Sequence, residues 1–173
     1  YEQSLRARVG LLAGLDARHL DDIAAHLPLT DGAARLVRVL ARLGYRTAVI
    51  SGGFDFAATA LQRQLGLDHA FANRLEIVDG VVTGRVLEPI VTPARKAELL
   101  AQVAADAGID LAQSIAIGDG ANDLPMLERA GLGIAFHAKP KLTAAADAAI
   151  SHGSLTRVLY LLGLRARDLD ELA

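Results

Sequence analysis

The sequence predicts an α/β fold: a parallel sheet with helices on both faces, a small helical cap and an inserted β-hairpin. Two observations carry this prediction. Short apolar runs alternate along the chain with helical segments, as the strands and helices of a parallel sheet do. The dipeptide Asp79-Gly80, a strong hairpin signal, stands between two further β-rich runs. We therefore expect parallel strands for most of the chain and one antiparallel pair in its middle.

The beginning of the chain predicts two short helices. Apolar residues recur at helical spacing over residues 2–12, which indicates the first helix. Asp16 can cap a second helix, which must end before Pro28. We assign residues 1–28 to part of a helical cap and residues 29–173 to the α/β core.

The core segment alternates strands and helices. Parallel strands are expected where short apolar, β-branched runs occur, at Arg46–Ile50, Ser114–Ile117, Gly133–Ala135 and Ala148–Ile150. The hairpin strands are expected at Leu75–Val78 and Val81–Val86. Helices are expected over Asp31–Leu43, Asp55–Leu65 and Thr92–Ala107, up to Ala130, near Leu142 and from Ser154.

The composition excludes several classes of function. The chain has 173 residues, of which 52% are hydrophobic and 22% charged, with a net charge of −2. No apolar run is long enough for a membrane helix, and no basic field is available for nucleic acid. The sequence contains no cysteine, which excludes disulfides, thiolate metal sites and cysteine nucleophiles. We expect a cytoplasmic protein that acts on a small molecule.

Two carboxylates follow the second parallel strand. Asp119 stands where the strand ends, and Asp123 stands one helical turn later, so both can address one point. Like charges at this spacing repel each other unless a cation lies between them. Oxygen ligands without cysteine or histidine suit Mg²⁺. The pair therefore predicts a magnesium site, and the alternative is that both residues only cap the next helix.

The first parallel strand is followed by Ser51 and Gly52, which offer a hydroxyl and accessible backbone N–H groups. This combination can bind an anion such as phosphate, or it can serve as an ordinary helix cap. Lys96 stands in the first turn of its helix, where a positive charge opposes the helix dipole. It is either an exposed lysine or a group that neutralises the charge of a phosphoryl group.

Arginines and histidines give weaker signals. Arg6 and Arg8 lie two residues apart on the opening helix and so face different directions. Either both are surface residues, or one points inward. His137 and His152 follow core strands, but neither has a partner at metal-ligand spacing, so we expect loop histidines.

Several motifs in order resemble the phosphoserine phosphatases, members of the haloacid dehalogenase superfamily. These motifs are SGGF at 51–54, Lys96 and GDGANDLPML at 118–127. YEQSLRARV at 1–9 is similar to the cap helix of that family, and PLTDGAARL at 28–36 to its return to the core. The resemblance implies a haloacid-dehalogenase-like Rossmannoid sheet. It also implies Mg²⁺-dependent hydrolysis of O-phospho-L-serine to L-serine and phosphate through an aspartyl-phosphate intermediate, the last step of serine biosynthesis.

The resemblance implies a phosphate-binding set within these motifs. Ser51 and the Gly52 amide would hold the phosphoryl oxygens. Lys96 would offset their charge and steady the nucleophile. Asn122 would form a hydrogen bond with the phosphate.

It also implies residues for the metal and for the rest of the substrate. Asp119 would bind Mg²⁺ directly, and Asp123 would support the metal shell through water or hydrogen bonds. Arg8 would clamp the substrate carboxylate with both arms of its guanidinium group. Tyr1 stands where many family members have phenylalanine, a small difference in the lining of the cap.

The aspartate nucleophile that the resemblance implies is not found near the beginning of this sequence. The family places an aspartate nucleophile and an aspartate acid/base two residues apart at the end of the first core strand. No Asp-x-Asp precedes Asp31, so we expect that strand upstream of Tyr1. For the intact protein we also expect a homodimer and amino-terminal regulatory domains.

Three alternatives to phosphoserine hydrolysis remain. The first is a phosphatase of another small phosphomonoester. The second is a non-catalytic module that begins at Tyr1 and binds Mg²⁺ and phosphate. The third is a segment of a P-type ATPase, which shares the GDGAND string but is disfavoured here because no membrane helix accompanies it.

Overall fold

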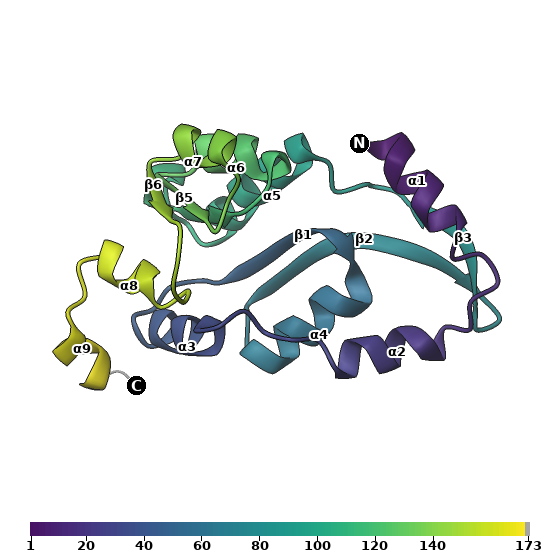
Figure 1. Ribbon diagram of the computed structural model, residues 1–173, viewed down its shortest axis with the longest axis horizontal. Helices are drawn as coiled ribbons and strands as arrows, with labels where there is room; N and C mark the ends of the chain where they lie inside the picture. The colour runs from purple at the N-terminus through teal and green to yellow at the C-terminus, as the bar shows by residue number, and fades with distance from the viewer. Residues whose placement is uncertain (172–173) are drawn as a thin grey trace.

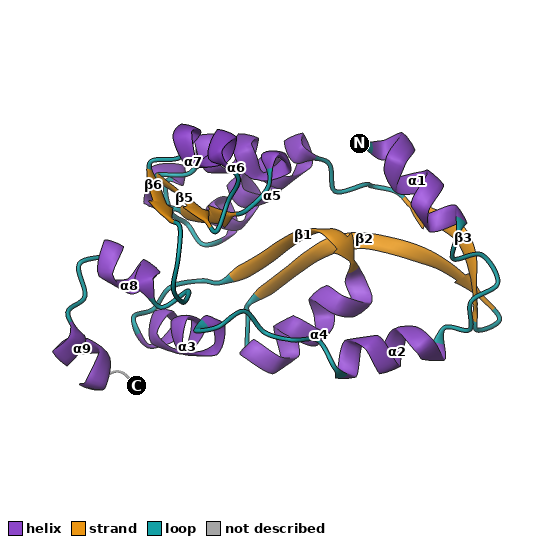
Figure 2. Ribbon diagram, in the orientation of Figure 1, coloured by secondary structure: helices purple, strands orange, loops and turns teal. Residues whose placement is uncertain are grey.

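The computed structural model describes residues 1–171 and contains two three-stranded sheets with helices around them (Figures 1 and 2). The strands are β1 (Ala48–Phe54), β2 (His69–Val78), β3 (Val81–Leu87), β4 (Ile115–Gly118), β5 (Leu132–Phe136) and β6 (Ala148–Ile150). The α-helices are α1 (Glu2–Gly10), α2 (Arg18–Ala25), α3 (Ala33–Arg42), α4 (Asp55–Leu65), α5 (Pro93–Asp106), α6 (Leu124–Arg129), α7 (Pro140–Ala145), α8 (Arg157–Leu161) and α9 (Ala166–Glu171). Two short 3-10 helices are η1 (Leu111–Gln113) and η2 (Ala121–Asp123).

The predicted α/β class is confirmed, but the single predicted sheet is two sheets. In the first sheet β1 runs parallel to β2, and β2 runs antiparallel to β3. In the second sheet β4, β5 and β6 are all parallel. Within the described chain no hydrogen-bonded ladder joins β1 to β4, so each of these strands forms one edge of its sheet.

Two strand predictions are too short. The strand predicted at 46–50 extends through Ser51 and Gly52, which we expected to follow it, and ends at Phe54, because pairing with β2 resumes there. The predicted strand at 75–78 starts already at His69, since its first half pairs with β1. The predicted final helix is divided into α8 and α9, with Gly163 at a φ of 84° between them.

Signals that lie within a few residues predict the elements well. Asp79 and Gly80 have φ of 50° and 78°, the left-handed values that a tight hairpin turn requires. The Thr92 side chain accepts a hydrogen bond from the Arg95 amide at 3.1 Å and so caps α5, with Pro93 at its first position. The helix predicted after Asp16 begins at Arg18, whose amide still donates to the Asp16 carboxylate.

The buried apolar residues form three clusters. One joins the first two helices to the hairpin, another packs α3 and α8 against the second sheet, and the third lies among α5, α6, α7 and that sheet. The first consists of Leu5, Val9, Leu20, Leu75, Val82, Val86 and Ile90. The second consists of Leu36, Val39, Ile134, Phe136, Ile150, Val158, Leu159 and Leu169, and the third of Ala97, Leu100, Ala116, Met126, Leu127, Ala135 and Leu142.

An apolar groove of about 860 Å³ runs between the two sheets. Its walls include Ala48–Ile50 of β1 and Ile115–Ile117 of β4, with side chains of α3, α5 and α8 closing it. The two edge strands therefore face the same cavity.

None of the helices in the described part of the chain has the length and hydropathy of a membrane-spanning segment.

Candidate active site

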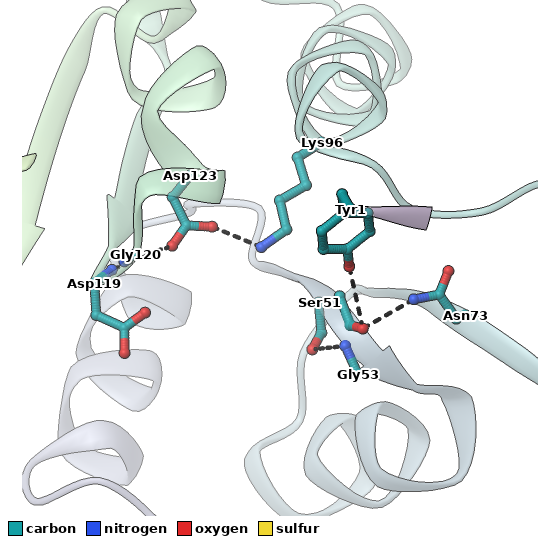
Figure 3. A network of polar contacts seen from close by, with 9 residues as sticks. Tyr1, Ser51, Gly53, Asn73, Lys96, Asp119, Gly120 and Asp123 are labelled. Atoms are coloured by element: carbon teal, nitrogen blue, oxygen red, sulfur yellow. Dashed lines mark hydrogen bonds and ion pairs between the residues drawn. The ribbon is translucent and has the colours of Figure 1, made fainter. Parts of the chain in front are cut away.

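The predicted site residues gather where β1 and β4 end (Figure 3). Ser51 is the middle residue of β1, and Asp119 directly follows β4. Lys96 reaches the same region from the first turn of α5, a helix that contacts β1. Ligands of open α/β sheets bind beyond the carboxyl ends of the strands, so this is the expected place for a binding site.

Lys96 and Asp123 form a buried ion pair. Lys96 Nζ donates to Asp123 Oδ1 at 2.6 Å, and the exposed fractions of the two side chains are 6% and 8%. The alternative that Lys96 is an exposed lysine is therefore wrong. A buried ammonium needs a charged partner, and this one has its partner at the carboxyl end of β4.

The other oxygen of Asp123 is held by the backbone. The amides of Asp119 and Gly120 donate to Asp123 Oδ2 at 3.2 Å and 3.1 Å, so Asp123 also organises the turn that follows β4. Gly118 makes this possible, since a Cβ at that position would lie 2.5 Å from the Cβ of Asp123. Asp123 therefore accepts hydrogen bonds from the backbone as a capping residue does, and it also forms the ion pair with Lys96.

The two predicted metal ligands do not converge in the structure. Asp123 is engaged by Lys96, while the exposed carboxylate of Asp119 points away from that pair (Figure 3). Among the side chains that the structure describes, no group of three or more histidine or acidic residues could hold a metal. The donor chemistry nevertheless fits Mg²⁺, which in phosphate-transfer sites is commonly held by one or two carboxylates, waters and the phosphate itself. Asp119, whose carboxylate has no described partner, is the residue that would bind it.

Ser51 is part of a glycine-containing segment held from two sides. Its hydroxyl oxygen accepts a hydrogen bond from the Gly53 amide at 3.0 Å. The carbonyl of Gly52 accepts from Asn73 Nδ2 at 2.9 Å and from the Tyr1 hydroxyl at 3.4 Å (Figure 3). Ser51 does not cap α4. The N-cap of that helix is Phe54, and no side chain caps it.

No motif in the sequence marks Asn73. This residue precedes the strand expected at Leu75–Val78 and lies in a segment of mixed polar and apolar residues, His69–Val78, where one more polar side chain is no signal.

The predicted substrate-binding residues outside this centre are more exposed. Arg8 lies on the surface of α1, and its Nε donates to the Ser4 carbonyl of the same helix at 3.2 Å. None of the described carboxylates pairs with Arg8, whereas Arg6 forms an ion pair with Glu88. Asn122 is half-buried, with its side-chain oxygen against Gly120. The structure brings neither Arg8 nor Asn122 into hydrogen bonding with Ser51 or Lys96.

Comparison with known proteins assigns the family. Residues 1–128 match the family described as haloacid dehalogenase-like hydrolase. The chain belongs to this family. A phosphoserine phosphatase of Streptomyces coelicolor is 56% identical over 170 residues, which are 98% of this chain and 42% of that protein. Another, of Methanocaldococcus jannaschii, is 43% identical, covering 92% of this chain and 75% of the relative.

Solved structures of family members agree with this fold. A probable phosphoserine phosphatase from Vibrio cholerae superposes with a TM-score of 0.90 at 39% identity, over 100% of this chain and 54% of that chain. A structure described as the phospho-aspartyl intermediate analogue of phosphoserine phosphatase has a TM-score of 0.88 at 43% identity, over 93% and 77% of the two chains. These relatives, within the haloacid dehalogenase-like hydrolases, are phosphoserine phosphatases.

The chain spans about half the length of several of these relatives. It contains one Asp-x-Asp, Asp168-Leu169-Asp170, but this lies on helix α9 rather than at the end of a strand. In the described part of the chain, no Asp-x-Asp at a strand end accompanies Lys96, Ser51 and the GDGAND segment.

Proposed function

We propose that this chain forms the phosphate- and Mg²⁺-binding part of an enzyme that hydrolyses O-phospho-L-serine to L-serine and phosphate. The observation that carries the proposal is the buried Lys96–Asp123 pair beside the Ser51–Gly53 segment. A lysine that is buried at the carboxyl end of a sheet, with hydroxyl and amide donors on the neighbouring strand, suits a dianionic phosphate. The similarity to phosphoserine phosphatases supports this substrate and its place in serine biosynthesis.

Each residue has a distinct task in the proposed reaction. Ser51 and the Gly52 amide bind phosphoryl oxygens, and Asn122 binds the same group from the turn after β4. Lys96 neutralises the charge that develops as the phosphoryl group passes to an aspartate and then to water. Asp123 keeps the Lys96 ammonium in place, at 2.6 Å.

Asp119 holds the metal in this proposal, with Asp123 supporting it through water. Bound Mg²⁺ would stabilise negative charge on the phosphoryl oxygens. Arg8 has no acidic partner among the described residues, which leaves its guanidinium available for the carboxylate of phosphoserine. The cap, of which residues 1–28 are part, would move to cover the bound substrate.

We also propose that a strand ending in Asp-x-Asp occupies the groove between β1 and β4. Three features support this occupant: both facing strands have free edges, the walls are apolar, and the carboxyl ends of both strands meet at the site. A strand parallel to both would deliver its last residues beside Ser51 and Asp119. The relatives, being longer than this chain, have additional sequence that could supply such a strand.

The test is phosphate release by the full-length protein, with Mg²⁺ or with a chelator. The substrates are O-phospho-L-serine and O-phosphoethanolamine, which lacks only the carboxylate. We expect Mg²⁺-dependent release from phosphoserine, lowered at least about 100-fold in Asp119→Asn. Arg8→Ala should raise KM for phosphoserine about 10- to 100-fold, because a charged double hydrogen bond is lost, and should leave the other substrate almost unchanged.

Two results would favour the alternatives. Equal effects of Arg8→Ala on both substrates would leave a phosphatase of another small phosphomonoester. Binding of Mg²⁺ and inorganic phosphate by the full-length protein without any turnover would leave the non-catalytic module.

A further inference from the structure

Asn73 is the most deeply buried polar side chain in the described part of the chain, with an exposed fraction of 0%. Both ends of its amide bond to distant backbone. Nδ2 donates to the Gly52 carbonyl at 2.9 Å, and Oδ1 accepts from the Val91 amide at 2.7 Å. These partners are 21 and 18 residues away along the chain. A single side chain therefore joins two segments of the candidate site.

The first bond lies where the β1–β2 ladder is irregular. Ile50 pairs with Phe71 and Phe54 with Asn73, so three residues of β1 stand opposite one residue of β2. Residues in such a bulge are left without regular ladder partners. The Asn73 side chain supplies a hydrogen bond to the carbonyl of Gly52, within the bulge.

This bond also orients Ser51. In a planar trans peptide the carbonyl and the next N–H point in opposite directions. The Gly52 carbonyl points to Asn73, so the Gly53 N–H points away from it, and this N–H donates to the Ser51 hydroxyl oxygen at 3.0 Å (Figure 3). Asn73 thus fixes the hydroxyl of Ser51 through one peptide plane.

The second bond fixes the approach to Lys96. The Val91 amide donates to Asn73 Oδ1. Val91 directly precedes Thr92, the N-cap of α5. The amide of Lys96 donates to the Thr92 carbonyl at 2.9 Å, in the first turn of that helix. The backbone that presents Lys96 and the backbone that presents Ser51 are therefore tied to the two ends of one amide group.

We propose that Asn73 is a positioning residue that holds Ser51 and Lys96 in register for a shared phosphoryl group. The proposal rests on the proposed function for the identity of that group. Tyr1 donates to the same Gly52 carbonyl at 3.4 Å, from the exposed start of α1, and is the weaker of the two constraints. Misplacement of catalytic groups by about 1 Å can lower a rate about 100-fold, so a fixed register is valuable here.

The experiment compares three variants of the full-length protein. Asn73→Asp keeps the acceptor for Val91 but, when ionised, loses the donor to Gly52. Its protonated form regains an O–H donor, so its function can be restored by lowering the pH. Asn73→Leu can neither donate nor accept at any pH. Val82→Ala is the control, because Val82 is as fully buried as Asn73 but belongs to the apolar cluster of α1, α2 and the hairpin.

We expect kcat for phosphoserine to fall about 100-fold in Asn73→Leu at every pH. In Asn73→Asp the ratio of its kcat to that of the wild type should rise towards one as the pH falls from about 8 to about 5.5, since burial favours the neutral acid. Val82→Ala, measured below its melting temperature, should stay close to the wild type. If both Asn73 variants behave like Val82→Ala, Asn73 only stabilises the fold, and the proposal is wrong.

A measurement without substrate separates this proposal from the proposed function. Hydrogen exchange of the Gly53 amide, followed by NMR, should become at least about 10-fold faster in Asn73→Leu than in Val82→Ala, because the bulge loses its anchor. If the wild type releases no phosphate, the proposed function fails, and the exchange rate alone decides the role of Asn73. Unchanged protection of Gly53 in Asn73→Leu would overturn the positioning role in either case.

Discussion

At the scale of single residues, the Lys96–Asp123 pair serves both structure and chemistry. Each charge is taken out of water, and each is compensated by the other at 2.6 Å. Asp123 gains two backbone amides in addition, from Asp119 and Gly120. Removing the ammonium would therefore leave a buried carboxylate with only neutral hydrogen-bond donors.

Lys96→Met should destabilise the protein by about 3–5 kcal/mol, the usual cost of an uncompensated buried charge. Adding Asp123→Asn removes that charge, so the double variant should regain a large part of this stability but no phosphatase activity. Urea unfolding and phosphate release, measured on the wild type, both single variants and the double variant, check this prediction. Equal stability of Lys96→Met and the double variant would show that the charge imbalance is not the cause.

The sequence marks candidate site residues that stand in local motifs, but it does not mark Asn73, whose proposed role depends on distant backbone. Ser51, Lys96 and Asp119 were accessible because strand ends and short polar strings mark them. Asn73 was not, because its importance comes from partners 18 and 21 residues away. The burial of Lys96 likewise could not be read from its neighbours along the chain.

At the scale of elements, the same division between local and distant interactions applies. The hairpin turn at Asp79-Gly80 and the helix that starts at Thr92 were predicted because a few adjacent residues determine them. The extension of β1 through Ser51–Phe54 was not, since it depends on pairing with β2 across an irregular ladder. The division into two sheets depends on contacts across the whole chain.

Asp68 anchors the start of the first sheet and gives it an acid-sensitive contact. Its carboxylate accepts from the Thr47 amide at 2.7 Å and pairs with Arg46 at 3.0 Å. The bond from the Thr47 amide, with smaller help from Arg46 and the Thr47 hydroxyl, lowers the pKa of Asp68 below its ordinary value of 3.8. A lowered folded-state pKa gives stability that is present above about pH 4 and is lost as the pH falls through the folded value.

Asp68→Asn should therefore lower the free energy of unfolding by roughly 1 kcal/mol at neutral pH, because one charged hydrogen-bond acceptor is replaced by a neutral amide. The difference from the wild type should shrink below about pH 4, where the Asp68 carboxylate becomes protonated first in the unfolded state and, at lower pH, in the folded state. Urea unfolding at a series of pH values measures it. A difference that is constant from neutral pH to strong acid would rule out ionisation of Asp68 as the source.

At the scale of the whole molecule, the groove explains how two separate sheets can belong to one site. The first sheet carries the Ser51 segment, and the second carries Asp119 and Asp123. Between their edges lies an apolar cavity of about 860 Å³, with Ile50 on one wall and Ile117 on the other. A strand paired to both edges would turn the two sheets into one and would fix the distance between the two halves of the site.

The groove can be tested by supplying a strand. We would fuse six valine and isoleucine residues and then Asp-Val-Asp to Tyr1 through a flexible Gly/Ser linker. Burial of the strand and its two hydrogen-bonded ladders should raise the melting temperature by at least about 5 °C and reduce binding of an apolar fluorescent dye. The matched control has proline at the third and fifth positions of the strand, because proline cannot donate to a ladder. If fusion and control melt at the same temperature, the groove does not take a paired strand, and the two halves of the site must be joined by other means.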